Sequence, residues 1–156
     1  MTNEVLSERI CPSCGSPMIK DIRPFEVTFS GRSIVVDAPG DYCTACDEAV
    51  FIGKDLAAAD RALHRLKAQA DGLLLPEEIR QIRKKLRLTQ TEASIILGGG
   101  PNAFHRYESG IGLPSQAVSN LLRVLAVDSK GLDVLRAQAS RSEAMVSSSK
   151  VSVSPR

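Results

Sequence analysis

The sequence is poor in aromatic residues, with no tryptophan, two tyrosines and four phenylalanines among 156 residues. It also lacks an apolar run near the roughly 18–20 residues that a membrane-spanning helix needs. Its first ten residues have neither the basic start nor the apolar core of a signal peptide. We therefore expect no membrane span, no export leader and a cytoplasmic location. The hydrophobic fraction of 43% is ordinary for a folded protein, which argues against wholesale disorder.

Negative charge is scarce in the second half of the chain. Residues 1–71 have a charge balance of −3 and residues 72–156 one of +5, although the whole chain carries only +2. Residues 80–106 contain six basic residues and a single acid, Glu92. This asymmetry predicts two modules, of which the second faces a polyanion. On charge alone, a solvated basic helix face is the favoured interpretation.

The four cysteines lie in the first third of the chain as two C-x2-C pairs, Cys11 with Cys14 and Cys43 with Cys46. Such pairs are typical of one zinc ion, because each presents two thiolates to a tetrahedral metal. Four protein ligands leave no position for a reactive water, so we predict a structural zinc. Iron or an iron–sulfur cluster, two disulfides and a redox C-x-x-C are the alternatives. Disulfides suit a chain without an export signal poorly, and a redox motif needs only one pair in a βαβ setting.

The segment between the cysteine pairs is rich in β-branched residues. PFEVTF and RSIVVDA flank Ser30-Gly31, which predicts a hairpin, while Pro39-Gly40 predicts a second turn and EAVFI a short strand. Residues 54–70 place apolar residues at helical spacing. Residues 1–71 are therefore expected to form a small β-rich, zinc-binding and partner-binding module with one helix.

The chain from Pro76 onward predicts five helices, over residues 76–86, 90–97, 101–109, 116–127 and 130–139. Thr89 and Glu92 have the form of a capping box, and Pro101 stands where a first helical residue is expected. The predicted fold class is α+β, with the β-rich module followed by an all-α helix-turn-helix domain over residues 72–139. Residues 140–156 contain seven serines and are predicted to form a flexible tail.

A helix, a capped helix, a glycine turn and a further helix make up a helix-turn-helix, whose second motif helix enters the DNA major groove. In PNAFHRYE, helical spacing puts Asn102, His105 and Arg106 on one face and Phe104 with Glu108 on another. Asparagine pairs with adenine and arginine with guanine, so Asn102 and Arg106 are predicted base contacts and Phe104 a core residue. An exposed polar pair on a surface helix is the alternative. The candidate DNA-backbone contacts are Arg83, Lys84, Lys85, Arg87, Thr89, Gln90, His105 and Tyr107.

Taken together, the two modules resemble the MqsA family of antitoxins. The resemblance depends on CPSC (11–14) and YCTAC (42–46), then on IRKKLRLTQTEAS (82–94), GGGPNAFHRYESG (98–110) and LLRVL (121–125). It implies that the four cysteines hold zinc and that the zinc module neutralises a cognate toxin, an mRNA-cleaving ribonuclease in the best-known members. It also implies a homodimer that binds a palindromic operator in double-stranded DNA and represses its own operon, with Asn102 and Arg106 at base-reading positions.

A stand-alone transcriptional regulator with a zinc-stabilised sensing or dimerising domain is the alternative function. An enzyme is not expected, because no nucleophile is paired with a base and the two histidines, His64 and His105, lie on separate predicted helices. A hairpin edge at residues 25–29 or 34–36 is a candidate for adding a strand to a partner's sheet, with a solvated edge as the alternative. The candidate dimer contacts on the last two helices are Leu121, Leu122, Leu125 and Leu132, with burial in the domain's own core as the alternative.

Overall fold

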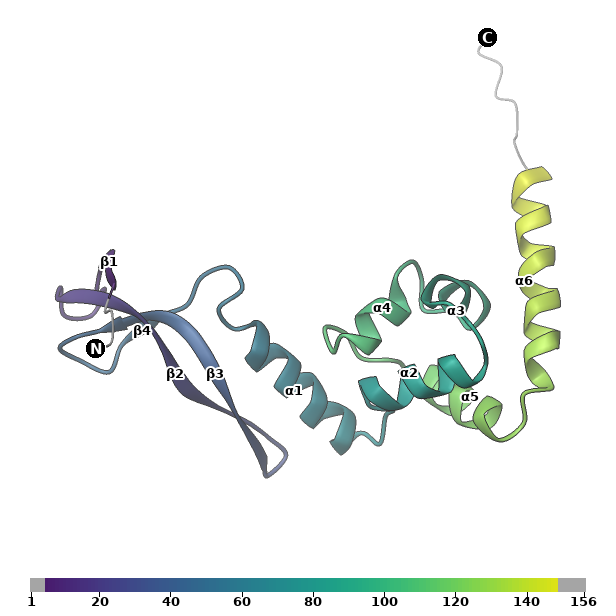
Figure 1. The fold of residues 1–156 in the computed structure, drawn as a ribbon, viewed down its shortest axis with the longest axis horizontal. Coiled ribbons are helices and arrows are strands. Elements are labelled where there is room, and N and C mark those ends of the chain that lie inside the picture. Colours follow the sequence, from purple (N-terminus) through teal and green to yellow (C-terminus); the bar gives the residue numbers. More distant parts are fainter. Residues whose placement is uncertain (1–4, 149–156) are drawn as a thin grey trace, which may run out of the picture. The chain divides into compact units, whose positions relative to one another are not determined.

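The structure is a computed structural model that describes residues 5–148 (Figure 1). The chain divides into two compact units between Ala70 and Asp71, and each unit is described by itself. The first holds the strands and one helix, and the second is entirely helical, so the predicted α+β class is confirmed. Within the described residues, no helix is both long and apolar enough to cross a membrane.

The first unit is built on a four-stranded antiparallel sheet in the order β1-β2-β3-β4. Its strands are β1 (Val5–Ile10), β2 (Pro17–Phe29), β3 (Arg32–Cys43) and β4 (Ala49–Val50). The long hairpin of β2 and β3 closes at Ser30-Gly31, where φ is 49° and 74°. Two successive positive φ angles match the right-handed twist of the strands, which confirms the predicted hairpin turn.

The predicted turn at Pro39-Gly40 is wrong, because β3 runs through both residues to Cys43. Pro39 pairs with Ile22 in the sheet. Gly40 is needed for packing rather than for turning, since a Cβ atom there would lie 2.9 Å from Cδ1 of Phe51. The absence of a Cβ atom thus lets the Phe51 ring lie directly against the strand.

Helix α1 (Ala57–Ala70) packs against one face of the hairpin, as Figure 1 shows. Small residues on the helix, including Ala59 and Ala62, let it approach Val27 of β2 closely. Partly buried apolar side chains complete this core, namely Phe25, Phe29, Ile34, Val36, Leu56 and Leu63. The hairpin face that carries these residues is therefore already covered within the unit.

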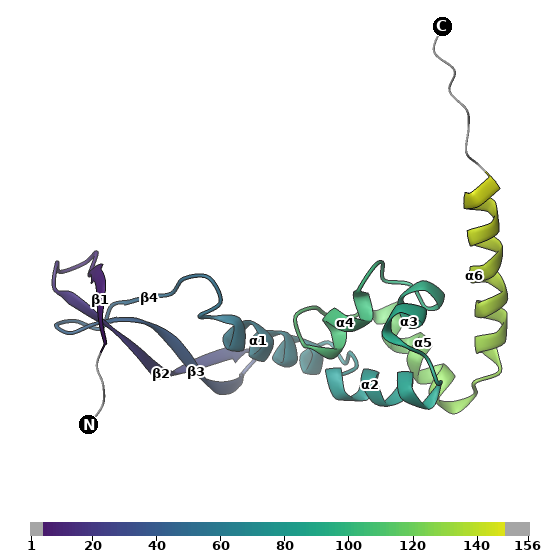
Figure 2. The ribbon, with the colours of Figure 1, turned by 45° about the horizontal axis from the view of Figure 1, so that its top comes forward.

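The second unit consists of five helices, which matches the predicted number (Figure 2). They are α2 (Pro76–Lys85), α3 (Gln90–Ile96), α4 (Ala103–Glu108), α5 (Gln116–Val127) and α6 (Gly131–Ser148). The capping box of α3 is confirmed, since Glu92 N–H donates to Thr89 Oγ1 at 3.2 Å and Thr89 N–H to Glu92 Oε2 at 2.7 Å. Phe104 is fully buried at the centre of the core, as predicted.

Two helix boundaries differ from the prediction by more than one residue. Helix α4 begins at Ala103 rather than at Pro101, because the turn of glycines continues into Asn102, whose φ is 59°. Asparagine tolerates this left-handed conformation better than most residues.

Helix α6 continues to Ser148, past the predicted start of the tail at residue 140. The hydroxyls of Ser140 and Ser142 donate to carbonyls one turn earlier, which lets serine fit the helix. Residues 149–156 of the predicted tail lie outside the described residues.

Candidate metal centre and nucleic-acid interface

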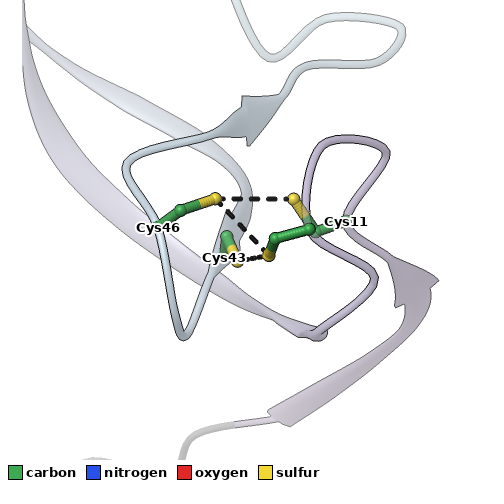
Figure 3. Close-up of side chains that lie close together, drawn as sticks. Cys11, Cys43 and Cys46 are labelled. Atoms are coloured by element: carbon green, nitrogen blue, oxygen red, sulfur yellow. Dashed lines mark hydrogen bonds between the residues drawn. The ribbon is translucent and has the colours of Figure 1, made fainter.

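The four cysteines converge at the end of the sheet where the two C-x2-C turns meet (Figure 3). Their sulfur atoms all lie within 4.8 Å of one another. The Sγ–Sγ distances are 3.7 Å for Cys11–Cys46, 3.4 Å for Cys14–Cys43 and 3.6 Å for Cys14–Cys46. Zinc–sulfur bonds of about 2.3 Å in a tetrahedron require sulfur separations of about 3.8 Å, whereas a disulfide requires about 2.05 Å. The geometry therefore fits one four-thiolate metal ion and not two disulfides.

Each pair lies on a tight turn that is closed in the same way. The N–H of Cys11 donates to the Ser16 carbonyl and that of Cys43 to the Glu48 carbonyl, both at 2.9 Å and both five residues along the chain. The N–H of Ala45 donates to Cys43 Sγ at 3.3 Å, which stabilises negative charge on that sulfur. Two similar turns thus present two sulfurs each, which is how C-x2-C pairs build a four-sulfur zinc site.

The thiols also perturb one another's ionisation. Side-chain and backbone hydrogen bonds from Ser16, together with those from the neighbouring thiols, lower the pKa of Cys14 to about 6. A backbone hydrogen bond at Glu48 favours the Cys46 thiolate, but hydrogen bonds with Cys43 and Cys14 and burial raise the pKa of Cys46 to about 12. Four sulfurs this close do not all ionise unless a cation offsets their charge. A divalent zinc ion would supply that charge.

A metal held here would have a structural role. Cys11 and Cys43 are buried against Met18, which is fully enclosed. Four sulfur ligands fill the tetrahedron, so no position is left at which water or a substrate could bind the metal. The four metal–sulfur bonds would join the β1–β2 connection to the β3–β4 connection, because each connection contributes one cysteine pair. The site thus suits the stabilisation of a small unit.

The second candidate site is the exposed face of α4. Asn102, His105 and Arg106 are exposed, whereas Phe104 and Glu108 are buried, so the predicted division of the helix into two faces is confirmed. Asn102 caps the N-terminus of the helix, and Arg106 lies about one turn further along. Both side chains therefore lie outside the core. They belong to α4, which corresponds to the second helix of the predicted helix-turn-helix.

A groove of about 560 Å³ separates α3 from the start of α4. It is lined by Gln90, Thr91, Ser94, Ile95, Gly100, Pro101, Asn102 and His105. At the base of the groove, the Ser94 hydroxyl donates to the Gln90 carbonyl at 2.9 Å and accepts the N–H of Phe104 at 3.3 Å. The first of these hydrogen bonds lies within α3, and the second links α3 to α4.

Several of the predicted DNA-backbone residues are engaged inside the unit. Arg83 donates to Glu108 through Nε and through Nη2, the latter at 2.9 Å, and its side chain is only 12% exposed. Gln90 Nε2 donates to the same carboxylate at 2.9 Å. Lys85 Nζ donates to the Ala126 carbonyl at 2.6 Å. Tyr107 is buried in the core. The predicted residues that remain exposed are Lys84, Lys85, Arg87, Thr89 and His105, although Lys85 is held by its hydrogen bond to Ala126.

Sequence reasoning missed the role of Glu108. Burial raises the pKa of this carboxyl, but hydrogen bonds from Arg83 and Gln90 outweigh that effect and hold it below its ordinary value. The same pairing raises the pKa of Arg83. The available signal was an acid four residues after Phe104, on the inward face of a helix in a basic region.

Known proteins match both units. The profile of the family described as "Antitoxin component of bacterial toxin-antitoxin system, MqsA" matches residues 9–136. Antitoxin MqsA of Escherichia coli (strain K12) is 40% identical over 118 residues, which cover 74% of this chain and 90% of that protein. Vegetative-specific protein H7 of Dictyostelium discoideum is 36% identical over 61 residues, or 38% of this chain and 59% of that protein. The chain therefore belongs to the MqsA family, the antitoxin components of bacterial toxin–antitoxin systems.

Proposed function

We propose that this antitoxin has two binding functions. Its zinc unit neutralises a cognate toxin that is an mRNA-cleaving ribonuclease, and its helical unit binds a palindromic operator and represses its own operon. The observation that carries the DNA-binding part is the pair of exposed residues Asn102 and Arg106 on α4, about one turn apart and free of the core. Membership of the antitoxin family carries the toxin-binding part.

The residue types on α4 suit the reading of base edges. Residues near the N-terminus of a recognition helix reach the bases, where asparagine binds adenine through two hydrogen bonds and arginine binds guanine in the same way. Lys84 and Arg87 are exposed at the end of α2 and just after it. We assign these two, with His105, to phosphate contacts, which set the register on the duplex and add no sequence preference.

A palindromic operator requires a two-fold symmetric dimer. Leu122, Leu125 and Leu132, which the sequence placed at a dimer interface, are instead buried within the unit, and Leu121 packs partly against the same core. On α5 and α6, Val124, Val127 and Val134 are 63%, 91% and 71% exposed. We assign the dimer contact to these valines, because burying them against a second copy would remove exposed apolar surface from water.

The zinc unit is suited to a protein partner rather than to DNA. The side chains of residues 1–71 balance to −3, and four thiolates on a divalent ion would add a formal −2, which repels phosphate. Along the hairpin, the described part of β1 pairs with β2 only as far as Lys20, and β4 pairs with β3 only at Asp41 and Tyr42. The remaining length of β2 and of β3 thus has an outer edge where a toxin strand could add to the sheet.

Co-expression with the neighbouring open reading frame tests the toxin-binding function. The expected results are growth rescue from a toxic neighbour and co-purification of the two proteins. A duplex from the chain's own promoter tests the DNA-binding function, with specific binding expected at physiological salt. If the promoter is bound but no neighbour is toxic and nothing co-purifies, the protein is a stand-alone regulator and the toxin-binding proposal is wrong.

A further inference from the structure

We infer that the groove between α3 and α4 reads one A·T base pair through two chemistries. In this arrangement, Asn102 binds the adenine edge, while Ile95 and Pro101 contact the 5-methyl group of a thymine. This inference rests on the proposed DNA binding and adds a residue from α3 to the sequence-reading surface. It makes Ile95 a specificity-determining residue.

Ile95 is an apolar side chain in a position that the core does not explain. It is 53% exposed on α3, while its neighbours Ser94 and Ala93 are buried. Its side chain lines the groove together with Pro101, Asn102 and His105. An exposed isoleucine is therefore placed beside the asparagine that we assign to base reading.

The chemistry of the groove matches the major-groove edge of an A·T pair. Adenine offers N7 as an acceptor and its N6 amino group as a donor, which suits the Asn102 amide, and thymine alone offers a methyl group. Ile95 and Pro101 offer apolar surface to that methyl group, which cytosine lacks, so a cytosine would lose the apolar contact. The groove thus favours thymine over cytosine as well as adenine over guanine.

DNA suits the groove better than other occupants do. Among the described residues that line it, none is acidic, and it is continuous with the face that carries Asn102 and His105. Gln90 donates its amide to Glu108, so it does not compete for the base at this point. The hydrogen bond from Phe104 N–H to the Ser94 hydroxyl joins the two walls, which reduces the reorganisation needed before a base pair enters.

Replacing thymine by deoxyuridine tests the inference, since it removes only the methyl group. The full-length protein would be titrated against its promoter duplex and against duplexes with single thymine-to-deoxyuridine changes. Burial of one methyl group is worth about fourfold in affinity, so we expect a loss of about fourfold at one thymine in each half-site. Ile95→Ala should lose most of the preference for thymine, since only the Pro101 contact with the methyl group remains. The control Ile111→Ala removes an isoleucine that is 49% exposed but does not line the groove, and it should retain the preference for thymine.

The outcomes separate this inference from the function on which it rests. If the wild-type protein binds its promoter specifically but no deoxyuridine change weakens binding, the groove does not contact a thymine methyl and the inference is wrong. It is also wrong if Ile95→Ala, folded by circular dichroism, retains the preference for thymine. If the wild-type protein binds its promoter no better than unrelated DNA, the proposed DNA-binding function fails first, and the inference fails with it.

Discussion

Arg83 of α2 forms a forked ion pair with the buried carboxylate of Glu108 on α4. The pair holds the helix that presents Asn102 and Arg106 against the first helix of the unit. Gln90 from α3 joins the same carboxylate, so three helices meet at one buried charge. The stability of the helical unit and the position of the exposed face of α4 therefore depend on the same contact.

Substitution of Arg83 should cost stability before it costs DNA contacts. Arg83→Ala leaves the Glu108 carboxylate buried without its main counter-charge, which we expect to lower the free energy of unfolding by about 3–5 kcal/mol. Lys84→Ala is the matched control, because the neighbouring lysine is exposed. That variant should unfold like the wild type. Its plot of the logarithm of the DNA-binding constant against the logarithm of salt concentration should have a slope smaller in magnitude by about one. Urea unfolding and binding titrations at several salt concentrations measure the two effects. Equal stability of the two variants would contradict the structural role of Arg83.

Acid should weaken the helical unit through Glu108. The pKa of this carboxyl is lowered in the folded state from an ordinary value of about 4.5, so the ionised form stabilises the fold above that pH. The stabilisation is then lost as the pH falls through the lowered pKa. As the pH falls below about 4.5, we expect the free energy of unfolding to fall more steeply for the wild type than for Glu108→Gln. An NMR titration of the Glu108 carboxyl carbon measures the same property directly, and a midpoint above 4.5 would contradict the assignment.

Removal of zinc should unfold the first unit and spare the second. The zinc unit has a small core, so metal binding is expected to supply much of its folding free energy. Native mass spectrometry should find one zinc per chain, and Cys43→Ser should lose it. A strong chelator should abolish the dispersed NMR signals of residues in the first unit only. His64→Ala is a control, since His64 lies outside the sulfur cluster and its loss should leave the zinc in place. Less than about half an equivalent of zinc, together with iron absorbance, would contradict the zinc assignment.

The glycine turn before α4 should tolerate substitution at one position better than at its neighbour. Gly99 and Gly100 both have positive φ angles, of 103° and 85°, so alanine is strained at either. Only at Gly99 would an added Cβ lie 2.8 Å from both the Ala103 Cβ and the Tyr107 hydroxyl. We therefore expect Gly99→Ala to lower the melting temperature and to weaken DNA binding more than Gly100→Ala does. Similar melting temperatures for the two variants would show that the turn adjusts without displacing α4.

Much of both sites could be predicted from local sequence. The cysteine spacing indicates a metal because it depends only on short turns, and the capping box at Thr89 is likewise a contact between residues three apart. The burial of Phe104 follows from helical spacing. Each of these features depends on residues that are close together in the chain, and such local relations are the ones that a single sequence shows most directly.

The features that were missed depend on contacts between distant residues. Pro39 and Gly40 are residue types that favour a turn. Here their pairing with β2 and the packing of Phe51 against Gly40 keep them in strand β3. Arg83 is a residue type that often contacts phosphate, but here it binds the carboxylate of Glu108, 25 residues further along the chain. In both cases tertiary packing overrides the local signal, which is itself compatible with either outcome.

The central claim is that the exposed face of α4 reads a specific DNA sequence. The most direct measurement compares affinities of the full-length wild type, Arg106→Ala and Asn102→Ala for the promoter duplex and for an unrelated duplex of equal length. The account predicts that each substitution weakens promoter binding by about 1–3 kcal/mol and leaves binding to the unrelated duplex nearly unchanged. Wild-type affinity of both variants for the promoter would contradict it.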